Sequence, residues 1–287
     1  MKKAAASMFI FLWCVFALQA QDVVIDPFKD CEKKPTLAKA GEYILTPSYN
    51  WQKDATQKGA DKQTFIFYHA KMKNPGAQWS RVLFTFDGEK EIPNYMIVPL
   101  PAGQKARKGD VVLTWWQSGS GMNRAFVVDD GNPAEPVVRY LDIDYDNPAK
   151  NRDGVKIGQM EEKLKPDTFV VIKDRMSPGT AVAVQEPAGR YVFARVISAT
   201  DTKVLVLGSV GKMSLVDRNK CVAADIIPNI KKGDVVQFPW NGIFKNGTVR
   251  KVDRKIGRVF IDFSLVKGKS EEKVIAFGNV LKGLAVK

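Results

Sequence analysis

The run Asp142-Ile-Asp-Tyr-Asp146, followed by Asp153, is the part of this sequence that comes nearest to a metal-binding pattern. Its carboxylates stand at positions 1, 3, 5 and 12 of a loop, as several oxygen ligands of a calcium-binding loop do. However, Asn147 stands where such a loop needs glycine for its sharp turn, and Lys150 occupies a ligand position. The alternative is a strand whose apolar residues face inward while its aspartates face water. We favour the strand and predict neither a metal site nor another cofactor.

His69 is the only histidine of the chain and lies in a predicted strand. A catalytic relay would need a nucleophile beside it in a pocket. The sequence has no Gly-x-Ser-x-Gly element and no cysteine in a catalytic signature. The segment 117–122, Gln-Ser-Gly-Ser-Gly-Met, is glycine-rich but lacks the Lys-Ser/Thr pair of a phosphate-binding loop. We therefore predict that the protein is not an enzyme.

The first twenty residues have the pattern of a secretory signal peptide. Lys2 and Lys3 precede an apolar run over 8–18, and Gln19-Ala20 precedes a polar start. Cys14 is a poor lipid-attachment site because a tryptophan stands before it, where a small residue is needed. No other stretch reaches the ~18 apolar residues of a membrane-spanning helix. We predict cleavage after Ala20, export to the periplasm or the extracellular space, and no membrane span after cleavage.

Two cysteines, Cys31 and Cys221, follow the predicted signal peptide. In an oxidising compartment an even pair of cysteines indicates a disulfide. The alternative is two buried free thiols. Neither cysteine has a second cysteine or a histidine at the spacing of metal ligands, so a zinc site is excluded.

An internal repeat is the strongest signal in the sequence. The segment 108–112, Lys-Gly-Asp-Val-Val, recurs letter for letter at 232–236, and a tryptophan follows both copies at the same distance. Ile143-Asp-Tyr145 and Ile261-Asp-Phe263 then end the two copies in the same order. A fainter third copy over 178–207 has no tryptophan and no acidic triplet. Self-similarity of this kind predicts a tandem of related structural units.

Each copy has the pattern of short strands separated by turns. In the last copy Asn246-Gly247 predicts a two-residue hairpin turn, and 254–257 predicts the next turn. Strands at this spacing, with glycine and proline between them, indicate small barrels or sandwiches. We predict a mostly β fold of tandem small barrels. The expected parts are a signal peptide (1–20), a β-rich region with a polar arm (21–105), and barrels over 106–174, 175–230 and 231–287.

The order Gly-Asp-Val-Val, tryptophan loop, strand, turn and Asp-aromatic strand end resembles the Tudor family of SH3-like barrels. The run 144–147, Asp-Tyr-Asp-Asn, is similar to the family's Asp-Tyr-Gly-Asn, with Asp146 replacing the glycine. The resemblance covers 106–165 and 231–285 well and 178–228 poorly. It implies an aromatic cage of the kind that binds methylated lysine or arginine by cation–π attraction. The residues implied are Trp116, Tyr145 and Asn147 in the first copy and Trp240, Phe244 and Phe263 in the last. The alternative is that these aromatic side chains fill the barrel cores.

Positive charge is concentrated at the carboxyl end of the chain. Of the net +13, the segment 231–287 carries +8, whereas 106–174 carries −2. Such a basic segment indicates an acidic partner. The residues predicted to bind a polyanion are Lys245, Arg250, Lys251, Arg254, Lys255 and Arg258.

Together these features predict a non-enzymatic envelope protein that binds or scaffolds a protein or glycan partner through its barrel loops. The alternative is a polyanion-binding module for nucleic acid or anionic glycopolymer. Salt separates the two, because polyanion binding weakens steeply as the salt concentration rises.

Overall fold

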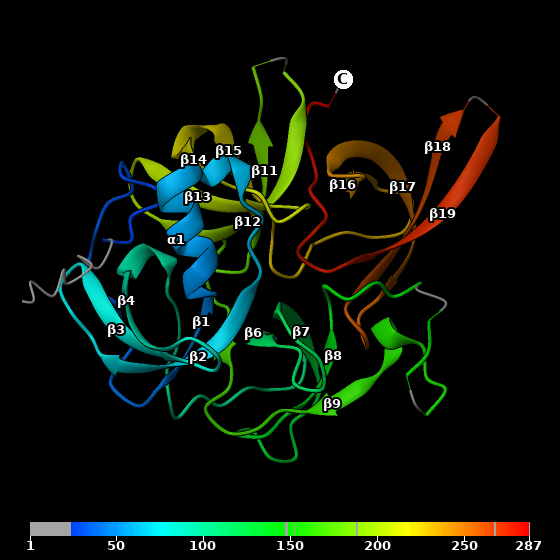
Figure 1. Ribbon diagram of the computed structural model, residues 1–287. Coiled ribbons are helices and arrows are strands. Elements are labelled where there is room, and N and C mark those ends of the chain that lie inside the picture. Colours follow the sequence, from blue (N-terminus) through cyan, green and yellow to red (C-terminus); the bar gives the residue numbers. More distant parts are fainter. Residues whose placement is uncertain (1–23, 147–148, 152, 188, 267, 287) are drawn as a thin grey trace, which may run out of the picture.

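The computed structural model describes residues 24–146, 149–151, 153–187, 189–266 and 268–286 (Figure 1). The predicted signal peptide and Asn147 lie outside the described residues. The fold is mostly β, as predicted, and the strands of the described residues form antiparallel sheets of five, five and nine strands, the last of which contains every strand from Ala181 onward. We name four units by their strands: unit 1 holds β1–β5, unit 2 β6–β10, unit 3 β11–β15 and unit 4 β16–β19. Within the described part of the chain, no helix is long and apolar enough to cross a membrane.

Unit 1 is a five-stranded antiparallel sheet with the strand order β4-β3-β2-β1-β5. A helix is inserted between its first two strands, and the Ser48 hydroxyl caps that helix by accepting the Trp51 N–H. The elements are β1 (Tyr43–Pro47), α1 (Tyr49–Lys58), η1 (Ala60–Lys62), β2 (Phe67–Asn74), β3 (Trp79–Phe84), β4 (Gly88–Pro93), η2 (Asn94–Met96) and β5 (Val98–Leu100).

Units 2 and 3 repeat this arrangement without the α-helix. Unit 2 has the strand order β10-β6-β7-β8-β9, and unit 3 has the order β15-β11-β12-β13-β14. The elements of unit 2 are β6 (Val111–Trp115), β7 (Met122–Asp129), β8 (Val137–Tyr140), η3 (Ile157–Gln159), β9 (Glu161–Lys163) and β10 (Val170–Val171). Those of unit 3 are β11 (Ala181–Gln185), β12 (Tyr191–Ala199), β13 (Lys203–Gly208), β14 (Met213–Asp217), η4 (Arg218–Lys220) and β15 (Cys221–Ala223).

Unit 4 contains β16 (Val235–Trp240), β17 (Ile243–Asp253), β18 (Arg258–Val266) and β19 (Lys269–Ala276). These four strands pair in sequence order, and Leu281 bridges to Gln237 on the outer side of β16. The bridge takes the place that the fifth strand has in the other units. All four units therefore share one strand order, including the amino-terminal unit in which the sequence showed no repeat.

A common turn precedes the first strand of every unit. It contains a glycine with positive φ, a conformation that glycine adopts without steric cost. The glycine N–H donates to a buried residue of the second strand, and the strand bulges directly after that residue in each unit. The four pairs are Gly41 with Met72, Gly109 with Val127, Gly179 with Val196 and Gly233 with Val249. In three units the next residue is acidic, and its carboxylate accepts a backbone N–H three residues back.

The predicted turn at Asn246-Gly247 is wrong, because these residues lie inside β17. The hairpin instead turns at Asn241-Gly242, where both residues have positive φ. Gly247 is needed for a close approach, since a Cβ there would lie 2.4 Å from Ile261 Cγ2. The predicted turn at 254–257 is confirmed, and Gly257 has a positive φ of 67°.

One hydrophobic cluster, the common core, contains residues of all four units, in addition to smaller clusters within units 1, 2 and 3. Leu45, Leu113, Leu205 and Ile261 come from units 1 to 4 in turn, and all belong to this core with at most 1% of their surface exposed. Because each small sheet buries little surface alone, the contacts between units supply much of the apolar burial.

A buried cluster of one aspartate and three arginines joins units 2, 3 and 4. Asp142 accepts the Arg124 backbone N–H at 2.8 Å and the Arg124 Nη2 at 2.7 Å. Arg195 of unit 3 places its Nη2 2.7 Å from the same carboxylate. Arg258 of unit 4 donates to two backbone carbonyl oxygens of unit 2. The expected strand with Asp142 facing water is therefore wrong: residues 141–146 form bends and a turn after β8, and three arginines converge on this part of unit 2.

Candidate functional site

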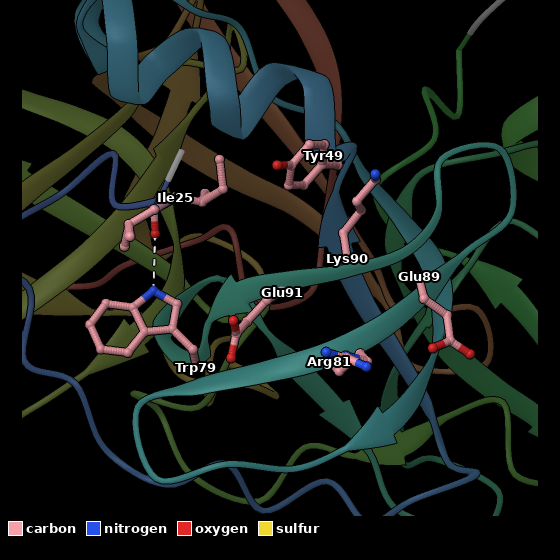
Figure 2. A pocket seen from close by; sticks show the side chains of 8 residues that line it. Ile25, Tyr49, Trp79, Arg81, Glu89, Lys90 and Glu91 are labelled. Atoms are coloured by element: carbon pink, nitrogen blue, oxygen red, sulfur yellow. Dashed lines mark hydrogen bonds between the residues drawn. The ribbon is translucent and has the colours of Figure 1, made fainter. Parts of the chain in front are cut away.

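A hollow lined by eight residues lies beside β4 in unit 1 (Figure 2). Its volume is about 690 Å³, within the range of about 300–1,000 Å³ that is usual for ligand sites. Two aromatic, four charged and two aliphatic side chains line it: Tyr49, Trp79, Arg81, Glu89, Lys90, Glu91, Val24 and Ile25.

The helix end at one wall of the hollow is fixed to the turn that leads into β4. The Asp87 carboxylate accepts the Tyr49 N–H at 3.2 Å and the Asn50 side-chain amide at 3.0 Å. Aspartate at this place also interacts favourably with the amino-terminal end of the α1 dipole. These contacts hold the Tyr49 ring above β4, where Lys90 Nζ lies 5.2 Å from its centroid.

The opposite wall is formed by Trp79 and the extended segment before the first strand. The Trp79 indole Nε1–H donates to the Ile25 carbonyl oxygen at 3.1 Å. The next residue, Asp26, pairs with Lys33 at 3.0 Å and accepts the Tyr95 hydroxyl at 2.7 Å. Burial, together with that hydrogen bond, raises the pKa of Tyr95 well above its usual range. The segment is thus anchored by a neutral phenol and a partly buried ion pair.

The hollow is lined by two basic and two acidic side chains. Arg81 and Glu91 are cross-strand partners on β3 and β4, and Glu89 pairs with Lys73 at 3.3 Å. Figure 2 shows Lys90 extending toward Tyr49, whereas Glu89 and Glu91 extend to the other side of the strand. No histidine, cysteine, serine or threonine is among the residues that line the hollow. The arrangement offers aromatic rings and charged groups of both signs to a ligand.

The two aromatic residues implied in unit 2 make separate packing contacts. Trp116 is half-buried on the core of its unit, and its indole nitrogen is buried without a hydrogen-bond partner. Gly119 lies against the face of its ring, where a Cβ would come within 2.3 Å. The Tyr145 ring instead lies 5.0 Å from the Arg258 guanidinium. The Trp116 face is covered by its own loop, and the third implied residue, Asn147, is outside the described residues.

The aromatic residues implied in unit 4 are mostly covered. Phe263 is 6% exposed, and its ring lies 4.9 Å from that of Trp240 and 5.1 Å from that of Phe238. Phe244 is 1% exposed and packs against Phe193 of unit 3. Trp240 ends β16 and is partly buried against the common core. These placements match the alternative in which the rings fill the core and the contact between units.

The six residues predicted to bind a polyanion are not all available to one. Arg258 is 3% exposed, and burial lowers its pKa to about 10. Arg250 pairs with Glu272, and Lys251 pairs with Asp253 at 2.9 Å. Lys245, Arg254 and Lys255 have no ion pair among the described residues.

The predicted disulfide is not present in the structure: Cys31 and Cys221 are both free. Cys31 is buried in the common core, and burial raises the pKa of its thiol to about 11. Cys221 lies in β15 beside Val184 of β11. A thiol with a raised pKa is mostly protonated and a weak nucleophile.

Neither the histidine nor the acidic run forms a reactive centre. His69 stacks on Trp115, with ring centroids 4.6 Å apart, and burial lowers its pKa. Burial alone would raise the pKa of Asp142, but the guanidinium groups of Arg124 and Arg195 outweigh it and hold the pKa well below its usual range. No cluster of metal-ligating side chains is found in the described ranges.

Sequence reasoning missed every residue of the hollow beside β4. The available signal was the alternation of β3 and β4, in which Trp79 and Arg81 share one face with Glu89 and Glu91. What the sequence did not show is that Ile25 and Tyr49 close over that strand. No protein-family model matches the chain, and no curated protein is significantly similar to it.

Proposed function

We propose that this protein is a non-enzymatic binding or scaffolding protein of the cell envelope, exported by residues 1–20, whose ligand is a protein or glycan held in the hollow beside β4. The observation that carries the proposal is the lining of that hollow, which consists of two aromatic rings, four charged groups and two aliphatic side chains. Aromatic faces with a few fixed polar groups are typical of binding sites.

The shared strand order supports the finer assignment of the four units as SH3-like barrels of the Tudor type. Small barrels of this type bind ligands with loops and strand edges at one side of the sheet. The hollow has this location in unit 1. The fold alone does not specify the ligand.

The common core supports a scaffolding role. Units that share apolar burial and the Asp142 cluster keep fixed relative positions, so a partner held at unit 1 has a defined orientation to units 2 to 4. A string of independent modules would not impose that geometry.

The proposal is tested by panning a random peptide display library and a glycan array against the chain from Gln21 onward. We expect binders whose affinity falls at least about tenfold in the Arg81→Ala variant, because losing a contact worth about 1.4 kcal/mol raises the Kd about tenfold. The matched control is Arg107→Ala, an arginine before β6 whose side chain is 71% exposed, which should leave binding unchanged. Binders that are indifferent to Arg81→Ala, or a complete absence of binders, would remove the proposal.

The second candidate function is polyanion binding by unit 4, favoured by the exposed Arg254 and Lys255 and the partly buried Lys245, which have no ion pair among the described residues. With about three contacts to phosphate or sulfate groups, the logarithm of the affinity should fall with a slope of about −2 to −3 against the logarithm of salt concentration. Retention on heparin is the measurement. If Arg254→Ala elutes at the same salt concentration as the wild type, this candidate is excluded.

A further inference from the structure

β4 is the outer strand of the unit 1 sheet. Among the described residues it pairs with β3 alone, so its other edge has no strand neighbour. An unpaired edge presents backbone N–H and C=O groups that another extended chain can satisfy.

The register identifies which groups face outward. The Asn94 N–H donates to the Gln78 carbonyl oxygen at 2.9 Å, in the same register that pairs Trp79 with Pro93. In an antiparallel pair the inward-facing groups recur at every second residue. The backbone N–H and C=O groups of Lys90 therefore point toward β3, whereas those of Glu89 and Glu91 point outward. Pro93, which has no N–H to offer, also falls on an outward position, where proline is tolerated.

The hollow opens onto this edge and not onto one face of the strand. It is lined by three consecutive residues, Glu89, Lys90 and Glu91. Because successive side chains point to opposite faces, only a space at the edge can touch all three. Tyr49 stands on the Lys90 side and Trp79 on the side of the glutamates, so the aromatic rings flank the edge on both faces (Figure 2).

We propose that β4 binds an extended peptide segment of a partner protein as an added strand, with a basic side chain of that peptide opposite Glu91. The inference rests on the proposed function and narrows its ligand from a protein or glycan to a peptide backbone. Peptide addition to a sheet edge takes its affinity from main-chain hydrogen bonds and its specificity from alternate side chains.

Charge favours a basic residue at the position opposite Glu91. Glu89 is already paired with Lys73, whereas Glu91 has no ion pair among the described residues. An opposite charge directly across a strand pair is favourable, and a like charge is unfavourable.

The first experiment scans a peptide selected from the display library with N-methyl groups, one residue at a time. We expect methylation to weaken binding about 3- to 10-fold at every second residue and to have little effect between, because only alternate N–H groups bond to β4. A flat scan in a peptide that still responds to Arg81→Ala would overturn strand addition and leave the proposed function standing. If a glycan responds to Arg81→Ala but no peptide does, strand addition fails and the proposed function stands; if neither responds, both fail.

The second experiment follows amide exchange in the full chain. In the free protein the Glu89 and Glu91 amides should exchange fast and the Lys90 amide slowly. The selected peptide should slow Glu89 and Glu91 at least about tenfold. Slow exchange at both glutamates before any peptide is added would show that the chain itself covers the edge, and the proposal would be wrong.

A matched pair of variants separates backbone from charge. Glu91→Pro removes one outward N–H and should weaken binding about 3- to 10-fold. Glu91→Gln keeps the N–H and should abolish only the preference for a basic residue in the selected peptides. If Glu91→Pro binds as tightly as Glu91→Gln in a chain with unchanged circular dichroism, the outward N–H makes no bond to the ligand.

Discussion

The substitution Asp142→Asn removes one charge from the buried cluster while keeping the size of the side chain. The carboxylate is 4% exposed and accepts hydrogen bonds from Arg124, which is 2% exposed, and from Arg195. Removing one partner of a buried ion pair costs about 3–5 kcal/mol, because the remaining charges stay buried without compensation. Against a total stability of about 5–15 kcal/mol, this is a large fraction.

Urea denaturation of the chain from Gln21 onward measures the effect. We expect one cooperative transition whose midpoint falls sharply in Asp142→Asn, because the units share one core. Asp153→Asn, an exposed aspartate of the same acidic run, is the control and should change the unfolding free energy by no more than about 0.5 kcal/mol. A loss of less than about 1 kcal/mol in Asp142→Asn would refute the view that the cluster holds the units together.

The same carboxylate gives the stability a defined pH dependence. Its folded pKa lies below the unfolded value of about 3.9, so the stabilisation is present above that pH and is lost as the pH falls through the folded pKa. The difference in unfolding free energy between wild type and Asp142→Asn should therefore be constant near neutral pH and shrink below about pH 4. A constant difference down to pH 2 would contradict the assignment.

Three further outcomes are expected. Gly247→Ala should cost about 1–3 kcal/mol of unfolding free energy because its Cβ would meet Ile261, and a neutral result in urea denaturation would count against the close packing. Phe244→Ala should cost about 3–5 kcal/mol, whereas Phe86→Ala, at a site 96% exposed, should cost little; equal midpoints would disprove the burial. Thiol titration of the unfolded, unreduced chain from Gln21 onward should find two reactive cysteines. If it finds no reactive cysteine, the two are joined in a disulfide after all.

The sequence predicted those features that depend on neighbours along the chain. Alternating strands and glycine turns gave a mostly β fold, which the structure confirms. The segments 108–112 and 232–236 are identical and form the same turn, because the glycine conformation and the aspartate hydrogen bond involve residues within a few positions. A turn that depends on contacts between residues a few positions apart can be predicted from the sequence of that segment.

Unit 1 escaped detection because its turn retains only the glycine of the repeated letters, with Glu42 in place of the aspartate, and because α1 separates its first two strands. Its strand order and bulge are nevertheless those of the other units. The hydrogen bonds of the common turn need only a glycine and an acceptor side chain. The other residues of the repeated segment can therefore differ between units.

Tertiary structure alone decided where Asp142 points and where the hollow lies. The run around Asp142 alternates like a solvated strand, and only the tertiary structure brings Arg124 and Arg195 to its carboxylate and so makes burial of its charge favourable. The hollow likewise exists because Ile25 meets Trp79 across 54 residues. A buried charge or a binding surface depends on groups that the chain brings together from a distance, and no local pattern records which groups those are.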